Sequence, residues 1–184
     1  VDPGFEAKKI VDCIEENGLR PMAIYLTHAH IDHVYGVPEL LQHYSVPVFI
    51  MEREVPVLET LPEQCSLYGF ERVENSFVSD FYESNDELVV GTARYSIHHT
   101  PGHSPGSCCF YNATDRLLVA GDLVFKGSIG RVDIPGGEDK AMARSLEWVK
   151  QLPGEVTILP GHGEATTVAQ ELAHNPFLNG RMSL

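Results

Sequence analysis

The sequence is poor in basic residues. Lysine and arginine together number 13 against 26 aspartates and glutamates, so the formal net charge is -13 with histidine neutral. A surface this acidic repels phosphate backbones and anionic lipid headgroups. We therefore expect neither nucleic acid nor a membrane surface among the partners. Nothing in the composition indicates the oligomeric state.

Cysteine is also scarce. The chain has Cys13, Cys65 and the adjacent pair Cys108-Cys109, and their spacing fits neither a disulfide framework nor a zinc ribbon. We interpret all four as reduced and structural, which favours a reducing compartment, the cytoplasm. The first residue is Val1 and not an initiator methionine, so a signal peptide before it stays an open alternative.

Long apolar runs are missing as well. Although 43% of the 184 residues are hydrophobic, no apolar run approaches the length that crosses a bilayer. This length and composition predict one domain over residues 1–184 with one sizeable core. The nucleophile-elbow motif of serine hydrolases is absent too, so any hydrolytic chemistry needs another source of nucleophile.

Histidines, in contrast, are concentrated in one stretch. Thr27-His28-Ala29-His30-Ile31-Asp32-His33 places three imidazoles and a carboxylate within six residues. The apolar run 23–26 before it is typical of a buried parallel strand, so we expect a loop at the carboxyl end of a central strand. Neutral imidazoles with a carboxylate suit zinc, iron or manganese. The pattern predicts a metal site, and a chance cluster of surface histidines is the alternative.

Alternating patterns along the chain predict an α/β fold. Val1-Asp2-Pro3-Gly4 indicates a strand that ends in a turn. Apolar spacing predicts helices over residues 7–17, 38–44, 52–58, 139–152 and 167–174. Short β-rich runs predict strands over residues 23–26, 46–50, 88–90, 93–98, 107–111, 117–120 and 156–159. Residues 59–86 show no period and are interpreted either as a long packed loop or as a wall or lid of a substrate pocket.

Three more candidate ligands follow predicted strands. His103 lies between two breakers in His99-Thr100-Pro101-Gly102-His103-Ser104-Pro105-Gly106, Asp122 follows strand 117–120, and His162 follows strand 156–159. Residues at strand ends can meet at one edge of a sheet. The candidate set is therefore His28, His30, Asp32, His33, His103, Asp122 and His162.

These motifs, in this order, resemble the metallo-β-lactamase superfamily, and within it the short bacterial hydroxyacylglutathione hydrolase (glyoxalase II-like) proteins. The matching segments are 27–33, 100–106, Gly121-Asp122, 128–133, Pro160-Gly161-His162-Gly163 and 175–178. The resemblance implies an αββα sandwich with the metal site at one edge between two sheets. Strands normally precede the Asp2-Pro3-Gly4 turn in this family, so we expect the sequence to be incomplete at its N-terminus.

The resemblance also implies a ligand set. His28, His30 and His103 would hold one divalent ion, Asp32, His33 and His162 a second, and Asp122 would bridge the two. Zinc is the first expectation, with iron or manganese as alternatives. Thr27 and Thr100 would fix ligand orientation, and His99 would support the site without binding a metal.

The implied reaction is hydrolysis of a thioester such as S-D-lactoylglutathione, or of a related ester or lactone. Two ions that share a hydroxide supply a nucleophile at neutral pH and polarise the carbonyl oxygen. Asp32 would orient that hydroxide. Arg131 is the candidate contact for a substrate carboxylate and Lys126 a weaker one, while an exposed Arg131–Asp133 pair is the alternative interpretation.

Two features differ from the longer glyoxalase II enzymes. The helical C-terminal domain with basic glutathione-binding residues is missing, and the segment 129–135 differs from the one that contacts glutathione. A broader thioester or lactone substrate is therefore an alternative. The rival functions are a mono-iron persulfide dioxygenase and, ranked last, a non-catalytic metal-binding module. β-Lactam hydrolysis has no specific support in the sequence.

Overall fold

The computed structural model describes residues 1–183 and divides the chain into two compact units, Val1–Tyr82 and Glu83–Leu184. Each unit has its own cluster of buried apolar side chains. The prediction of a single domain over residues 1–184 stays a prediction. No helix within residues 1–183 combines the length and the apolar character that a membrane span requires.

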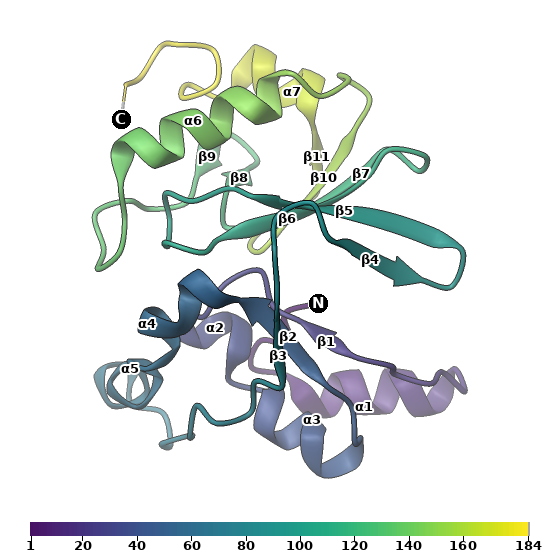
Figure 1. Cartoon of the computed structure of the whole chain (residues 1–184). Coiled ribbons are helices and arrows are strands. Elements are labelled where there is room, and N and C mark those ends of the chain that lie inside the picture. The colour runs from purple at the N-terminus through teal and green to yellow at the C-terminus, as the bar shows by residue number, and fades with distance from the viewer. Residues whose placement is uncertain (184) are drawn as a thin grey trace. The chain divides into compact units, whose positions relative to one another are not determined.

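The first unit is built on a parallel sheet of three strands in the order β1-β2-β3 (Figure 1). The strands are β1 (Ile24–Tyr25), β2 (Val48–Met51) and β3 (Asp80–Tyr82). The helices are α1 (Ala7–Glu16), α2 (Ile31–Val34), α3 (Val37–His43), the 3-10 turn η1 (Glu52–Glu54), α4 (Val55–Leu58) and α5 (Leu61–Tyr68). The parallel βαβ unit predicted from residues 23–50 is confirmed.

The unassigned stretch 59–86 contains a helix and a strand, so the prediction of a loop throughout was wrong. Helix α5 has Pro62 in its first turn and Gly69 as its C-cap with φ of 75°. Proline at a helix start lacks only an N–H that would be unsatisfied anyway, and glycine adopts the left-handed conformation of a helix end. Both residues delimit the helix and do not break it. The rest fits the packed-loop interpretation, since Val73 and Phe77 pack on the first core.

Three smaller expectations for the first unit also need correction. Strand β1 is an edge strand of the three-stranded sheet, because β2 lies at its centre. The histidine stretch is not a loop throughout: α2 begins at Ile31 and includes Asp32 and His33. Residues 1–3 form no strand, although the predicted turn at Gly4 is present.

The second unit contains a six-stranded sheet in the order β11-β10-β7-β6-β5-β4. Its strands are β4 (Glu87–Val90), β5 (Ala93–His99), β6 (Cys108–Asn112), β7 (Leu117–Gly121), β10 (Thr157–Pro160) and β11 (Thr166–Thr167). A separate hairpin pairs β8 (Val124–Phe125) with β9 (Ser128–Ile129), and the sequence patterns predicted neither this hairpin nor β11.

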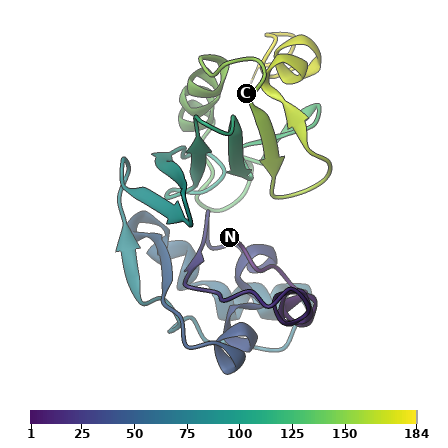
Figure 2. The same cartoon turned by 90° about the vertical axis from the view of Figure 1, so that its right-hand side faces the viewer.

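Two helices cover one face of this sheet, α6 (Asp139–Lys150) and α7 (Val168–His174) (Figures 1 and 2). Met142, Leu146 and Val149 of α6 pack with Leu118 of β7 and Ile158 of β10. The predicted start of α7 is confirmed, because the Thr167 hydroxyl accepts the N–H of Gln170 as its N-cap. The apolar stripes of the helices and the alternation of the strands thus account for this core.

Candidate metal centre

The first group of candidate ligands follows strand β1 directly. His28 and His33 are buried, and His30 is the N-cap residue of α2. The short helix places Asp32 in its first turn, with Asp32 Oδ2 3.9 Å from His33 Nε2. The β1–α2 connection therefore brings four donor side chains together within one unit.

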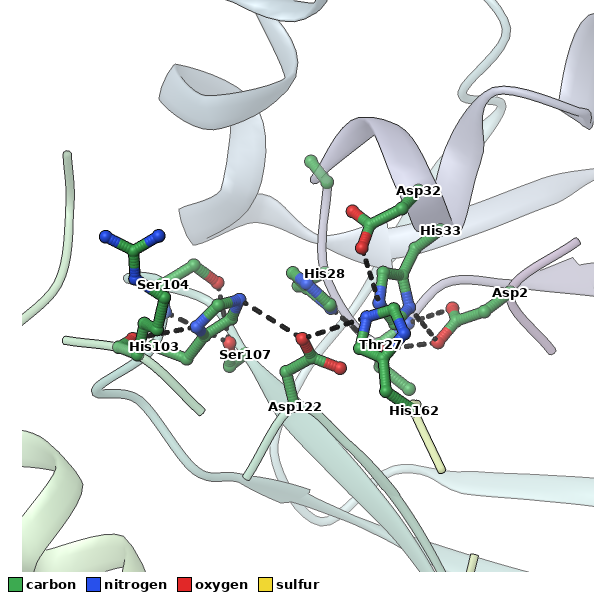
Figure 3. Close-up of polar contacts among 12 residues, drawn as sticks. Asp2, Thr27, His28, Asp32, His33, His103, Ser104, Ser107, Asp122 and His162 are labelled. Carbon is green, nitrogen blue, oxygen red and sulfur yellow. Dashed lines mark hydrogen bonds and ion pairs between the residues drawn. The ribbon is translucent and has the colours of Figure 1, made fainter. Parts of the chain in front are cut away.

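A carboxylate from the start of the chain organises this group. Asp2 Oδ1 accepts the backbone N–H of Thr27 at 2.7 Å, and Asp2 Oδ2 accepts the Thr27 hydroxyl at 2.6 Å. The same Oδ2 lies 3.0 Å from Nδ1 of His33 (Figure 3). Asp2, His28 and His33 offer ligand-type atoms within 4.8 Å of one another. The Asp2 oxygens accept these three donors and so hold Thr27 and His33 in place.

These contacts fix the tautomers of two imidazoles. The Thr27 hydroxyl donates to Asp2, so its oxygen accepts from Nδ1 of His28, 3.0 Å away. His33 donates its Nδ1 proton to Asp2. With the proton on Nδ1, Nε2 carries the lone pair in both rings, which is the state of a metal-binding histidine. This donor set fits a divalent transition-metal ion.

Two side chains from the η1–α5 segment hold the backbone of the histidine stretch. The buried Glu54 accepts the N–H of Ala29 at 3.0 Å, and the Gln64 side-chain oxygen accepts the N–H of Ile31 at 2.9 Å. Donors at the start of a helix need such partners. Gln64, from the stretch that showed no sequence period, and Glu54, from the predicted helix before it, thus support the loop that carries the candidate ligands.

The second group comes from three strand ends of the six-stranded sheet. Strands β7 and β10 are parallel neighbours, so Asp122 and His162 follow them at the same edge. Strand β5 also runs parallel to β7, because each is antiparallel to β6 between them, and the loop after β5 carries His103. These three residues therefore lie at one edge of the six-stranded sheet, whereas the first group of candidates follows β1 of the other sheet.

Each separation between Asp122 and a histidine of this second group fits two ligands of one cation. Asp122 Oδ2 lies 3.6 Å from Nε2 of His103 and 3.4 Å from Nε2 of His162 (Figure 3). Ligand atoms about 2.1 Å from one tetrahedral ion lie about 3.4 Å from each other. Separations of 3.4 and 3.6 Å are longer than an ordinary hydrogen bond and match the spacing of two ligands of one ion.

His103 is oriented by a carbonyl that sequence reasoning did not foresee. Its Nδ1 donates to the carbonyl of Arg131 at 2.8 Å, so Nε2 carries the lone pair. Gly130 allows this approach: a Cβ there would lie 1.9 Å from the Asp122 carbonyl oxygen and 3.2 Å from Nδ1 of His103. The Gly130-Arg131 backbone therefore packs directly against two candidate ligands.

The residues predicted to support the site have definite positions. His99 Nε2 donates to the Pro105 carbonyl at 2.8 Å and so fixes the loop that carries His103. The Thr100 hydroxyl lies 3.3 Å from the Sγ of Cys109, and not against a ligand, in the part of the chain that the structure describes. Burial raises the pKa of Cys109 to about 12, so this thiol is a packing group.

Both candidate substrate cations form exposed ion pairs. The Arg131 guanidinium makes two contacts with Asp133, at 2.9 and 3.0 Å, and lowers the pKa of that carboxyl. Lys126 donates to Glu164 at 2.6 Å, which raises the pKa of Lys126 and lowers that of Glu164. Exposed pairs of this kind are weak and exchange partners readily. A substrate carboxylate can therefore compete for either cation.

Asp2 has an evident role that the sequence patterns did not single out. Its signal was only the Asp2-Pro3-Gly4 turn, while its partners Thr27 and His33 lie 25 and 31 positions later. Glu54 and Gln64 were missed for the same reason, since both act through backbone amides in another segment.

Comparison with known proteins identifies the family of the chain. The model of the metallo-β-lactamase superfamily matches residues 1–162, and the chain belongs to that family. It is 39% identical over 182 residues to the probable metallo-hydrolase YqgX of Bacillus subtilis, and this match covers 97% of this chain and 86% of that protein. It is 36% identical over 186 residues to the hydroxyacylglutathione hydrolase GloC of Haemophilus influenzae, with 98% and 87% covered.

Solved structures show the same fold. A structure described as the BLEG-1 B3 metallo-β-lactamase matches with a TM-score of 0.89 at 36% identity, over 97% of this chain and 87% of that one. TTHA1623 in a di-iron-bound form also matches with a TM-score of 0.89, at 37% identity, over 96% and 87%. The predicted family and fold are thereby confirmed, and the chain is a member of a superfamily of metallo-hydrolases.

Proposed function

We propose that the protein is a dinuclear metal-dependent hydrolase that cleaves a thioester such as S-D-lactoylglutathione, or a related ester or lactone. The observation that carries this proposal is the donor set. Asp2, Thr27 and the Arg131 carbonyl hold the Nδ1 protons of His33, His28 and His103. Asp122 Oδ2 lies 3.6 Å from Nε2 of His103 and 3.4 Å from Nε2 of His162. The name of the Haemophilus influenzae relative supports the thioester class.

The ligand assignment is part of the proposal. His28, His30 and His103 hold one ion, Asp32, His33 and His162 hold a second, and Asp122 bridges them. The di-iron form of TTHA1623 supports two metals per site. Zinc is the first candidate, and iron and manganese suit the same donors.

The chemistry follows from these residues. When bound, two divalent ions lower the pKa of water toward neutrality and polarise a carbonyl group. Asp32, whose side chain is about one-third exposed at 34%, would orient the attacking hydroxide. A thiolate leaving group departs without strong help from an acid, which agrees with a site that offers no dedicated proton donor in this proposal.

The cations of the β8–β9 region bind the anionic part of the substrate. Arg131 exchanges its exposed partner Asp133 for a substrate carboxylate, and Lys126 does the same with Glu164. We place the substrate among small molecules, because the acidic surface repels nucleic acids and anionic lipid headgroups.

A panel of substrates tests the proposal. Purified protein is assayed with S-D-lactoylglutathione, with the lactoyl thioester of a neutral thiol, and with a lactone, before and after removal of metal by a chelator. We expect thioester hydrolysis that is lost with the metal and restored by adding it back. Asp122→Asn should lower kcat at least about 100-fold, because the bridging carboxylate is lost. Unchanged hydrolysis after complete metal removal would contradict the proposal.

A β-lactam in the same panel covers a second function. The likeness to the BLEG-1 B3 enzyme at 36% identity is the observation that favours it. Oxygen uptake with a persulfide substrate distinguishes the mono-iron dioxygenase, which consumes oxygen where a hydrolase does not. Activity confined to either of these substrates would replace the thioesterase assignment.

A further inference from the structure

The hairpin 122–131 contains one candidate ligand of the second unit, Asp122, and contacts the other two, His103 and His162. It begins at Asp122, and its far end supplies the carbonyl of Arg131 that accepts Nδ1 of His103 at 2.8 Å. Within it, the ring of Phe125 lies 5.9 Å from that of His162, edge to face. The position of this one hairpin therefore affects the orientation of every donor in the group.

Three buried side chains at the C-terminal end of the unit hold the hairpin. Glu171 of α7 is 1% exposed, and its Oε2 accepts the N–H of Gly127 at the hairpin turn at 2.8 Å. Asn175, fully buried, donates to the Ser128 carbonyl at 2.8 Å and to Glu171 at 2.9 Å. Thr166 completes the set by donating to Glu171 Oε1 at 2.6 Å.

The cost of this arrangement indicates that it does more than fill the core. A buried carboxylate is unfavourable unless donors surround it, and an apolar side chain of similar size would pack without that cost. Here each donor to Glu171 comes from a different place: the hairpin turn, strand β11 and the residue after α7. Such a network specifies one position of the hairpin, where apolar packing would tolerate several.

We propose that Glu171 and Asn175 are positioning residues for the metal ligands of the second unit, and that they act through the hairpin Asp122–Arg131. The inference rests on the proposed metal centre. Movement of the hairpin withdraws the Arg131 carbonyl from His103, which frees that ring to rotate or to change tautomer. It also loosens Gly130 against the Asp122 backbone, where the packing leaves no room for a Cβ.

Asn175→Ala is the main test, and the chain offers a matched control. Asn112 is equally buried and also holds a hairpin turn, through hydrogen bonds with Asp115 at 2.7 and 2.9 Å. It lies at the opposite end of β7 from Asp122, so Asn112→Ala should destabilise the unit without reaching the ligands. Glu171→Gln and Thr166→Val nearly preserve side-chain volume and change the same network, and Thr166→Val is the mildest change of the three.

The readouts are zinc affinity, by competition with a chromophoric chelator, and the visible spectrum of the cobalt-substituted protein. We expect Asn175→Ala and Glu171→Gln to weaken zinc binding about 10–100-fold and to alter the cobalt spectrum. Asn112→Ala should have the zinc affinity and the cobalt spectrum of wild type. Its loss of thermal stability, measured in the presence of chelator, should be comparable to that of Asn175→Ala.

Two results separate failure of this inference from failure of the proposed function. In the first result, the wild-type protein binds metal, but the three network variants have the same zinc affinity and cobalt spectrum as Asn112→Ala. This result overturns the inference alone. The three variants are Asn175→Ala, Glu171→Gln and Thr166→Val. Wild-type protein that binds no divalent metal overturns the proposed centre and the inference with it. If Asn175→Ala does not fold, the comparison of Thr166→Val with wild type decides, with a several-fold weaker zinc affinity expected.

Discussion

The carboxylate of Asp2 lies 3.0 Å from Nδ1 of His33 and accepts the Thr27 hydroxyl at 2.6 Å with the same oxygen. Through Thr27, whose oxygen faces Nδ1 of His28 at 3.0 Å, this one carboxylate fixes two imidazole rings. Carboxylates in this position set the tautomer of a ligand histidine and raise its basicity. Asp2 thus fixes the orientation of two imidazole rings of the histidine stretch.

Replacing Asp2 should therefore weaken metal binding. In Asp2→Asn the amide presents a donor where His33 or Thr27 also donates, so at least one of these contacts is lost. We expect about 10–100-fold weaker zinc affinity by chelator competition. Asp12→Asn, an exposed position on α1 that pairs with Lys8, is the matched control and should bind zinc like wild type. Equal affinities for the two variants would contradict the role assigned to Asp2.

Gly130→Ala should damage both stability and the second ligand group. The new Cβ would lie 1.9 Å from the Asp122 carbonyl, so the backbone of one or both residues must shift. Overpacking of this kind costs about 1–3 kcal/mol or more. The control is Gly91→Ala in the β4–β5 turn, where nothing lies within 4 Å of the new Cβ and the cost is about 1–2 kcal/mol of backbone strain at φ of 60°. Chemical denaturation and zinc titration measure both effects. Wild-type zinc affinity in Gly130→Ala would show that the close packing is irrelevant to the ligands.

The environment of His98 predicts that the stability of the fold depends on pH through a residue other than the candidate metal ligands. Its ring stacks on Trp148 of α6 at 4.4 Å, meets Tyr111 of β6 edge to face and lies 2.9 Å from the Ser96 hydroxyl. Burial lowers the pKa of His98 below its ordinary value of 6.5. The unfolded chain therefore binds this proton more tightly, so the stabilising contribution is complete above pH 6.5 and is lost as the pH falls through the lower folded pKa.

The measurement is thermal unfolding of metal-free protein between pH 7.5 and 5. His98→Phe keeps the aromatic contact with Trp148 and removes the titration. As the pH is lowered from 7.5 to 5, the melting temperature of this variant should therefore decrease less than that of wild type. His43→Phe, at an exposed position on α3, should retain the wild-type slope. Identical slopes for all three proteins would mean that His98 does not contribute to the pH dependence.

Arg131→Met tests the contact with an anionic substrate. Losing a charge-assisted hydrogen bond to a substrate carboxylate should raise KM for S-D-lactoylglutathione about tenfold, with little change in kcat. The matched control is Arg94→Met, since Arg94 forms a comparable exposed pair with Glu87 at 2.7 Å. A thioester of a neutral thiol should show no difference between the two variants. If KM for S-D-lactoylglutathione is also unchanged, Arg131 does not bind the substrate.

The strand ends of the second unit could be predicted from sequence because local patterns coincide with topology. Apolar runs before Asp122 and His162 mark β7 and β10, and parallel pairing places the residues that follow at one edge. The same logic failed at β1, which is an edge strand and not a central one. The pairing partners of a strand determine its place in the sheet, and the short apolar run 23–26 carries no information about those partners.

The supporting residues could not be predicted, because their partners lie far away in sequence or on the backbone. In the sequence, Glu54 is one of several charged residues of a predicted short helix, and only the structure shows that it accepts the Ala29 amide. The β8–β9 hairpin has strands of two residues each, too short for any period, and depends on Glu171 and Asn175 for its position. Composition patterns report burial and period, whereas these roles depend on tertiary hydrogen bonds.

The central claim is a dinuclear metal centre, and the most direct test is the metal content of the protein as purified without added metal. Elemental analysis against protein concentration should give two ions of zinc, iron or manganese per chain, and Asp122→Asn should give fewer. A single iron per chain would contradict the dinuclear hydrolase and favour oxygen-dependent persulfide chemistry. Absence of metal, with no uptake on addition of zinc, iron or manganese, would contradict the metal centre itself.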